Sequence, residues 1–194
     1  MIFKDLKKDL FTIPNWLSFF RLLLIPVYVL IYLNATEPHE YAIAAGILAV
    51  SCLTDMIDGQ IARHFNMIST FGKFLDPLAD KATQGTLLIC LAIRQPILWT
   101  LVGIMVVKEG FQLFAGILAF RKGKILSGAL FSGKVCTTVL FISLILLVLK
   151  PDVKTVYVNL LTIINGIFLL IAFAHYVFVY HYRTAKIQDL EENT

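Results

Sequence analysis

Six apolar stretches, each close to the length that crosses a lipid bilayer, dominate this chain of 194 residues. They cover approximately residues 16–33, 40–62, 77–93, 97–119, 129–149 and 156–180. A transmembrane helix needs about 20 predominantly apolar residues. Hydrophobic residues make up 58% of the chain and charged residues 15%, against about half and about a quarter in a soluble domain. Because a membrane segment must satisfy its backbone polar groups internally, we predict an all-α integral membrane protein with six transmembrane helices.

The connections between these stretches are short, and none is rich in Ser or Gly. We therefore expect a single membrane domain over residues 1–194. Before Pro14, apolar residues alternate with Lys and Asp, a pattern typical of a short amphipathic helix in the membrane interface. The apolar members are Ile2, Phe3, Leu6 and Leu10.

Basic residues flank the apolar stretches unevenly, and the net charge is +4. This placement favours contact with anionic lipid or phosphate over nucleic acid. With six spans, one side of the membrane receives Lys4, Lys7, Lys8, Arg63, Lys73, Lys81, Arg121, Lys122, Lys124, Lys134, Arg183 and Lys186. The other side receives Arg94, Lys150 and Lys154. The positive-inside rule then places both termini and the 63–76 region in the cytoplasm, in a multi-pass protein of the cell membrane.

Four aspartates lie at the facing ends of two apolar stretches. Asp55 and Asp58 are three residues apart near the end of the second stretch, and Asp76 and Asp80 are four apart near the start of the third. Both spacings place a pair on one face of a helix. Because the intervening loop is short, we expect antiparallel helices with all four carboxylates at the cytoplasmic end. Carboxylates within membrane helices are functional by default.

These four carboxylates need positive charge beside them. Arg63 and Lys81 supply part of it, but two divalent cations compensate the charge more completely. Oxygen ligands favour magnesium or manganese, and these ions neutralise pyrophosphate oxygens in phosphoryl transfer. The alternative is a structural ion-pair cluster, which does not require four carboxylates at one membrane edge.

Small and basic residues accompany the aspartates. Gly59 and Ala62 follow Asp55 by four and seven residues, and a face without bulk lets a nucleotide or a neighbouring backbone approach closely. Gly72 lies four residues before the third aspartate and serves the same purpose. Arg63 points to the same side as Asp55, where a guanidinium binds a phosphate through two nitrogens.

The stretch DMIDGQIAR at 55–63, followed by Gly72, Asp76 and Asp80, resembles the signature of the CDP-alcohol phosphatidyltransferase family. All eight fixed positions are present at the expected spacing, and the resemblance extends over the whole chain. It implies six membrane helices and an enzyme of phospholipid biosynthesis. Such an enzyme transfers a phosphatidyl group from CDP-diacylglycerol to an alcohol and releases CMP. Members of the family are often dimers, so a homodimer is a further expectation.

The resemblance also implies residue roles. The implied ligands of two divalent cations, Mg²⁺ or Mn²⁺, are Asp55, Asp58, Asp76 and Asp80. The implied CDP-binding residues are Gly59, Ala62, Arg63 and Gly72. Asp80 is also the implied general base, and an alcohol needs such a carboxylate because it is a poor nucleophile at neutral pH.

Two further stretches indicate the acceptor. PNWLS at 14–18 and GKFLDPLADK at 72–81 resemble bacterial phosphatidylglycerophosphate synthases, which use glycerol 3-phosphate. Cardiolipin synthases of the eukaryotic type share much of this sequence and accept phosphatidylglycerol. The bacterial synthases usually carry Arg-Glu in the fourth helix, where this chain has Lys108 and Glu109.

A phosphorylated acceptor needs cations, and we predict a pocket that contains Lys108, Lys134 and Arg121. The alternative for Arg121 is ordinary loop charge, and for Lys134 it is a side chain reaching to the interface. Arg21 lies one turn inside the first helix, and we expect it to pair with the aspartate cluster or with Glu109.

Other interpretations remain. The same chemistry fits phosphatidylglycerol, inositol phosphate or serine as acceptor. A cation transporter needs charges near the bilayer midplane and often repeated halves, whereas these carboxylates lie at one edge and no internal repeat is present. An inactive scaffold conflicts with the intact signature.

Overall fold

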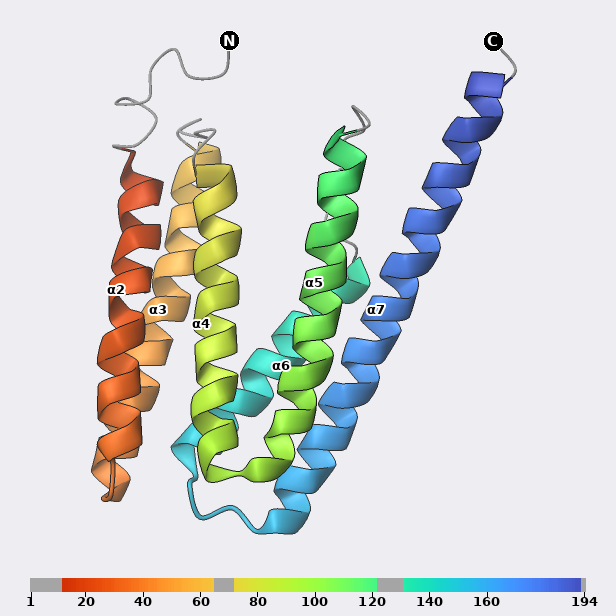
Figure 1. The fold of residues 1–194 in the computed structure, drawn as a ribbon. Helices are drawn as coiled ribbons and strands as arrows, with labels where there is room; N and C mark the ends of the chain where they lie inside the picture. The colour runs from red at the N-terminus through yellow and green to blue at the C-terminus, as the bar shows by residue number, and fades with distance from the viewer. Residues whose placement is uncertain (1–11, 65–71, 122–130, 193–194) are drawn as a thin grey trace. The chain divides into compact units, whose positions relative to one another are not determined.

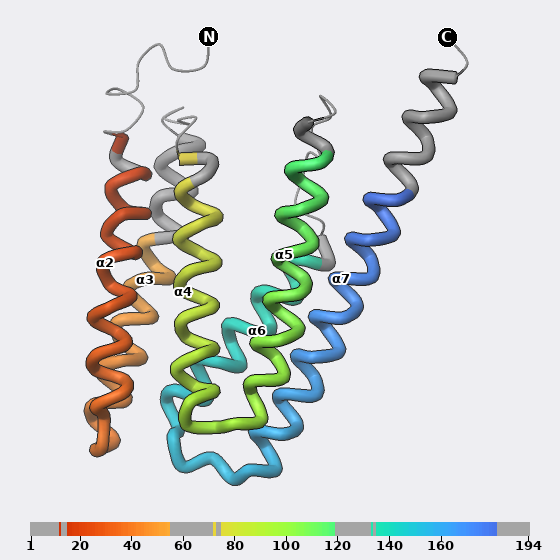
Figure 2. The backbone as a smooth tube through the Cα atoms, in the orientation of Figure 1, coloured from red at the N-terminus to blue at the C-terminus, as the bar shows by residue number. Residues whose placement is uncertain are grey.

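The computed structural model describes residues 12–64, 72–121 and 131–192. Within these ranges it describes the backbone but not the side chains of several residues near helix ends, among them 55–64, 119–121, 134 and 182–192. The described ranges contain helices and no strand. The helices are α2 (Ile13–Asn34), α3 (Pro38–His64), α4 (Gly72–Arg94), a 3-10 turn (Pro96–Leu98), α5 (Trp99–Arg121), α6 (Phe131–Leu149) and α7 (Thr155–Glu192) (Figure 1). Figure 2 traces the same backbone as a tube.

Each predicted apolar stretch lies within or largely overlaps a long helix, which confirms the all-helical fold. Within the described residues, three helical segments are long and apolar enough to cross a membrane: Asn15–Asn34, Pro96–Leu118 and Thr155–His181. Val135–Leu149 is a shorter apolar helix. These are the features of a membrane protein. The predicted interfacial helix before Pro14 lies almost entirely outside the described residues.

Two helix boundaries differ from the prediction by more than three residues. The third helix begins at Gly72 and not at residue 77, so Asp76 is helical and Pro77 lies inside α4. A proline inside a helix removes one backbone hydrogen bond and often marks a helix boundary, whereas α4 starts five residues before Pro77. α7 continues to Glu192, twelve residues beyond the predicted end at 180. The prediction stopped where the apolar run stops, whereas the next residues include good helix formers.

The chain divides into two compact units. The first contains Met1–Arg94 with Leu144–Val153, and the second contains Gln95–Ser143 with Lys154–Thr194. In the first unit, α2 packs against both α3 and α4. α3 runs antiparallel to the other two helices (Figure 1). Ala44 and Ala79 are fully buried, and their small side chains let the helix backbones approach closely.

Arg94 joins the three helices of the first unit at one end. Its guanidinium donates to the backbone carbonyls of Tyr32 at 3.1 Å and Ala35 at 2.8 Å, and to the hydroxyl of Tyr41. It also lies over the rings of Tyr32 and Tyr41, 5.2 and 5.0 Å from their centroids. The last carbonyls of a helix have no intrahelical partner, so Arg94 satisfies the end of α2 while it anchors the end of α4.

In the second unit, α5 packs against α7, in part through aromatic residues. The ring of Phe111 meets Phe173, Tyr176 and Tyr180 edge to face, with centroids 5.4, 6.2 and 6.2 Å away. Such geometry stabilises a helix pair beyond simple burial. These tyrosines therefore pack against α5.

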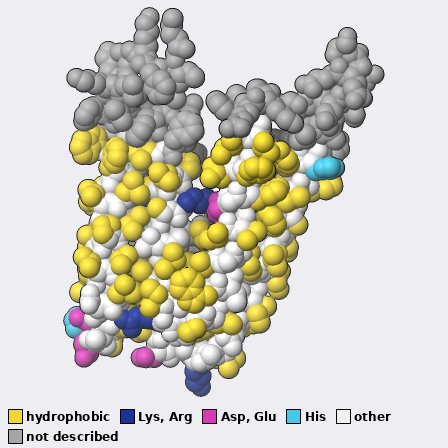
Figure 3. Space-filling model, in the orientation of Figure 1, with side chains coloured by type: hydrophobic (Ala, Val, Ile, Leu, Met, Phe, Trp, Pro, Cys, Tyr) yellow, Lys and Arg dark blue, Asp and Glu magenta, His cyan; other side chains and the backbone are white. Residues whose placement is uncertain are grey.

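Large apolar side chains cover the flanks of the helices. Figure 3 shows hydrophobic atoms over much of the visible described face and few charged ones. Exposed examples are Leu23, Val106, Phe114, Val156, Ile163 and Phe178, each at least 60% exposed. A soluble monomer rarely exposes so many large apolar side chains, whereas lipid tails cover them in a bilayer.

Candidate functional site: two aspartates of α4 and their α2 partners

Asp76 and Asp80 lie one turn apart in the first half of α4. The helix starts at Gly72, which is buried, and this start places both carboxylates near one end of the first unit. Asp76 is partly exposed, and the side chain of Asp80 is 51% exposed. Both carboxylates therefore reach the surface of the helix group, where a ligand has access to them.

Two residues of α2 contact these aspartates. The Ser18 hydroxyl donates to Asp76 Oδ1 at 2.5 Å, and the Arg21 guanidinium donates to Asp80 Oδ1 in a salt bridge. Ser18 is fully buried and Arg21 is 2% exposed. The expectation that Arg21 pairs with the aspartate cluster or with Glu109 is therefore confirmed for the cluster, through Asp80.

Ser18 is a site residue that the sequence interpretation did not single out. A serine inside a helix commonly bonds to its own backbone, so its identity alone carries little signal. The available signal was spacing: Ser18 and Arg21 are three residues apart, which places both on one face of α2. That face meets the carboxylates of α4.

The other two aspartates, Asp55 and Asp58, lie on the last part of α3. The end of α3 lies at the same end of the first unit as the start of α4 (Figure 1), as the short loop predicted. The side chains of Asp55 and Asp58 fall outside the described ones, as do those of the neighbouring Ala62 and Arg63; Gly59 lies in the same segment. Among the described residues alone, no group of three or more potential metal ligands is present. The four-aspartate metal site remains a prediction.

The chemistry of the described donors fits a divalent cation of the magnesium type. Asp76 and Asp80 offer carboxylate oxygens at an accessible helix end, and Cys52, Cys90 and Cys136 lie elsewhere in the sequence. Hard oxygen ligands suit Mg²⁺ and Mn²⁺, whereas soft thiolates suit zinc or copper.

The predicted acceptor residues lie in the second unit. Lys108 of α5 is 3% exposed and donates to Glu109 Oε1 at 2.7 Å. Arg121 is the last residue of α5, and Lys134 lies in the first turn of α6; the side chains of both fall outside the description. Lys108 therefore has a carboxylate neighbour, as a cation needs when it is buried.

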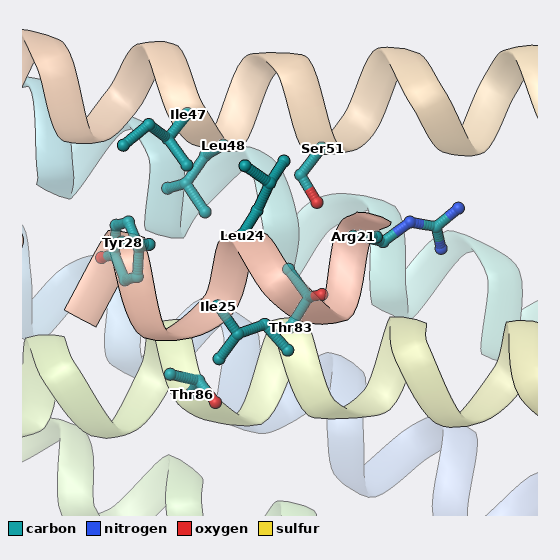
Figure 4. Close-up of a pocket in the computed structure, with 9 residues that line it drawn as sticks. All are labelled: Arg21, Leu24, Ile25, Tyr28, Ile47, Leu48, Ser51, Thr83 and Thr86. Atoms are coloured by element: carbon teal, nitrogen blue, oxygen red, sulfur yellow. The ribbon is translucent and has the colours of Figure 1, made fainter. Parts of the chain in front are cut away.

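A small cavity lies between α2, α3 and α4 beside Arg21 (Figure 4). Its lining includes Leu24, Tyr28, Leu48 and Thr83, and its volume of about 10 Å³ holds about one water molecule. In Figure 4 the guanidinium of Arg21 points away from Tyr28, at the opposite end of the cavity lining. The cavity is too small for a lipid chain.

Residues 11–178 match the sequence model of the family described as CDP-alcohol phosphatidyltransferase. The chain belongs to this family. The matched residues extend into both units and include every site residue predicted above, from Asp55 to Lys134.

Individual relatives have two kinds of name. The chain is 32% identical to a probable phosphatidylglycerophosphate synthase of Mycobacterium tuberculosis over 165 residues, which are 80% of this chain and 78% of that protein. It is 30% identical to the CDP-diacylglycerol–glycerol-3-phosphate 3-phosphatidyltransferase of Escherichia coli K12, over 77% of this chain and 84% of that protein. It is also 38% identical to a cardiolipin synthase (CMP-forming)/mitochondrial hydrolase fusion protein of Schizosaccharomyces pombe. That alignment covers 55% of this chain and 17% of the yeast protein.

Proposed function

We propose that this protein transfers the phosphatidyl group of CDP-diacylglycerol to a hydroxyl of glycerol 3-phosphate, forming phosphatidylglycerophosphate and CMP. The observation that carries the proposal is the alignment with the mycobacterial and Escherichia coli proteins over about four-fifths of both chains. An acceptor pocket is built from residues dispersed along a chain, so similarity over most of the chain is stronger support than similarity around the aspartates alone.

The proposed chemistry divides the four aspartates between two tasks. Asp55, Asp58 and Asp76 hold two divalent cations, with Asp80 as an additional contact. When bound, these ions supply positive charge to the pyrophosphate of the donor. Asp80 takes the proton of the acceptor hydroxyl, and the oxygen of that hydroxyl attacks the lipid-bearing phosphorus. The bond from that phosphorus to the CMP oxygen breaks, and CMP leaves with the electron pair. The half-exposed carboxylate of Asp80 supports this role, because a general base needs access to its substrate.

The remaining site residues bind the two substrates. Gly59, Ala62, Arg63 and Gly72 line the CDP moiety. Lys108, Lys134 and Arg121 contact the phosphate of the acceptor. The support for this acceptor group is chemical, since each residue is a cation and the acceptor is an anion.

The proposal includes a membrane arrangement. The six long helices form six spans of one domain, and both termini and the active site face the cytoplasm in the cell membrane. The family match supports the single domain because it extends across both units. The distribution of Lys and Arg supports the orientation. The protein acts as a homodimer, as the family resemblance suggests.

A second candidate is a cardiolipin synthase, which uses phosphatidylglycerol as acceptor. The yeast relative, with its higher identity over a shorter segment, favours it. Lys108 stands in the position where bacterial phosphatidylglycerophosphate synthases usually carry Arg, a departure from the pattern of the first candidate.

One assay of acceptor specificity distinguishes the two candidates. Purified protein in detergent is given labelled CDP-diacylglycerol with glycerol 3-phosphate, phosphatidylglycerol, inositol phosphate, serine or glycerol in parallel. Asp80→Asn, which removes the proposed general base and keeps a side chain of similar size, serves as the inactive control. We expect product only with glycerol 3-phosphate. Turnover of phosphatidylglycerol without turnover of glycerol 3-phosphate would move the protein to the second candidate.

A further inference from the structure

Two side-chain contacts join α2 to α4. Ser18 and Arg21 are three residues apart on α2, and their partners Asp76 and Asp80 are four apart on α4. Both spacings equal about one helical turn. One face of α2 therefore reaches both carboxylates, and a single packing of the two helices sets the position of each.

The α2 residues of these two contacts differ in charge. The hydroxyl of Ser18 is neutral, so it orients Asp76 and leaves the negative charge of the carboxylate in place. The guanidinium of Arg21 is positive, so it compensates the charge of Asp80. A cation is attracted to the first carboxylate more than to the second, because a divalent ion beside Asp80 also meets the positive charge of Arg21.

The contacts of Arg21 indicate a role through Asp80. Its side chain is 2% exposed, whereas that of its partner Asp80 is 51% exposed. The neighbouring cavity has room for about one water molecule, and the guanidinium does not point toward its Tyr28 end (Figure 4). Arg21 therefore acts through Asp80, which presents its exposed side to the substrates.

We propose that Arg21 is a positioning residue that limits the contact of Asp80 with the metal ions and keeps its carboxylate available as the general base, while Ser18 orients Asp76 as a metal ligand. The inference rests on the proposed function and deepens it. It explains how two aspartates one turn apart on the same helix come to have different tasks.

The test compares Mn²⁺ binding with turnover in purified protein. Mn²⁺ binding is followed by electron paramagnetic resonance, and turnover is measured at saturating metal. We expect Arg21→Gln to bind Mn²⁺ as tightly as the wild type or more tightly, since a competing cation is gone. We expect its kcat to fall at least 10-fold, with KM for CDP-diacylglycerol within about twofold of the wild type. These values follow from the contribution of about 10²–10⁴-fold that a positioned general base makes.

Ser18→Ala is the matched comparison, because it removes the other contact, between Ser18 and Asp76. It should weaken Mn²⁺ binding about 2- to 10-fold, which corresponds to the net contribution of one hydrogen bond. Arg21→Lys keeps the charge and should recover part of the kcat that Arg21→Gln loses. It also provides a measurement if the Gln variant does not fold.

A double variant separates positioning from general support of the fold. If Arg21 acts through Asp80, Arg21→Gln should cause no further loss of turnover in the Asp80→Asn background. A full additional loss there, or a Mn²⁺ affinity that falls in Arg21→Gln as it does in Ser18→Ala, would overturn the inference. Failure of the wild type to turn over any acceptor would instead refute the proposed function, and the comparison of Mn²⁺ binding would stand apart from that result.

Discussion

The guanidinium of Arg94, the last residue of α4, donates a hydrogen bond to the hydroxyl of Tyr41 on α3. The Tyr41 hydroxyl in turn donates a hydrogen bond to the carbonyl of Ala35 at 2.9 Å. This junction lies at the opposite end of α4 from Asp76 and Asp80. Because helices are stiff, a junction that fixes the far ends of α2 and α4 also fixes the register in which Ser18 and Arg21 meet the aspartates.

We expect Arg94→Ala to lower the thermal stability of the protein more than Tyr41→Phe does. Tyr41→Phe removes hydrogen bonds but keeps the ring beneath the guanidinium, at a cost of about 0.5–1.5 kcal/mol per hydrogen bond. Arg94→Ala removes every contact of the guanidinium and leaves the carbonyls at the end of α2 without this donor. Thermal unfolding in detergent measures the difference. Equal midpoints for Arg94→Ala and the wild type would show that the junction does not support the fold.

Removal of divalent metal should abolish turnover. The expectation follows from carboxylate oxygens as the predicted ligands, which suit magnesium and manganese. Activity should return when Mg²⁺ or Mn²⁺ is added after chelation, whereas Ca²⁺, with its longer bonds and less rigid geometry, should restore less. Full turnover after thorough chelation, checked by elemental analysis, would contradict the two-metal interpretation.

Substitutions of the two α4 aspartates should have different effects. Asp76→Ala should weaken metal binding as well as rate, because the residue is a proposed ligand. Asp80→Asn should leave CDP-diacylglycerol binding largely intact and lower kcat by about 10²–10⁴-fold, because a neutral amide cannot take the acceptor proton. Lipid binding and single-turnover rates measure the two effects separately. An Asp80→Asn rate within a few-fold of the wild type would show that another group is the base.

Hydrophobic pattern predicted the positions of the helices, because apolar stretches of membrane length rarely form anything else. The boundaries at Gly72 and Glu192 were missed, since neither lies at a change in hydropathy. A helix can start before a proline and can continue through polar residues when they are good helix formers.

The site was predictable in its residue types and less so in its contacts. The spacing of Asp76 and Asp80 placed them on one face of a helix, and the structure has them on one helix beside α2. The sequence left two kinds of partner open for Arg21, because the choice between the aspartate cluster and Glu109 depends on which helices pack together. Arg94 was assigned only a role in topology, and its contacts with Tyr32 and Ala35 follow from the tertiary arrangement.

Lys134→Gln should mainly raise the KM for glycerol 3-phosphate and leave the KM for CDP-diacylglycerol nearly unchanged. Lys134 is a proposed partner of the acceptor phosphate, and loss of a charge-assisted contact costs roughly 1.5–3 kcal/mol, or about one to two decades of affinity. Steady-state kinetics with each substrate varied in turn measures the two constants. Lys154→Gln is the matched control, since it removes the same charge from an exposed residue ahead of α7.

Glycerol separates a phosphate contact from a structural role of Lys134. Glycerol has no phosphate, so it should be a poor substrate for the wild type and should lose much less activity than glycerol 3-phosphate in Lys134→Gln. The difference arises because a lysine that binds the acceptor phosphate makes no such contact with glycerol, so its loss does not weaken glycerol binding. Equal losses with both acceptors would place Lys134 in support of the fold or of the CDP site, and Lys108 and Arg121 would then be the remaining candidates for the acceptor phosphate.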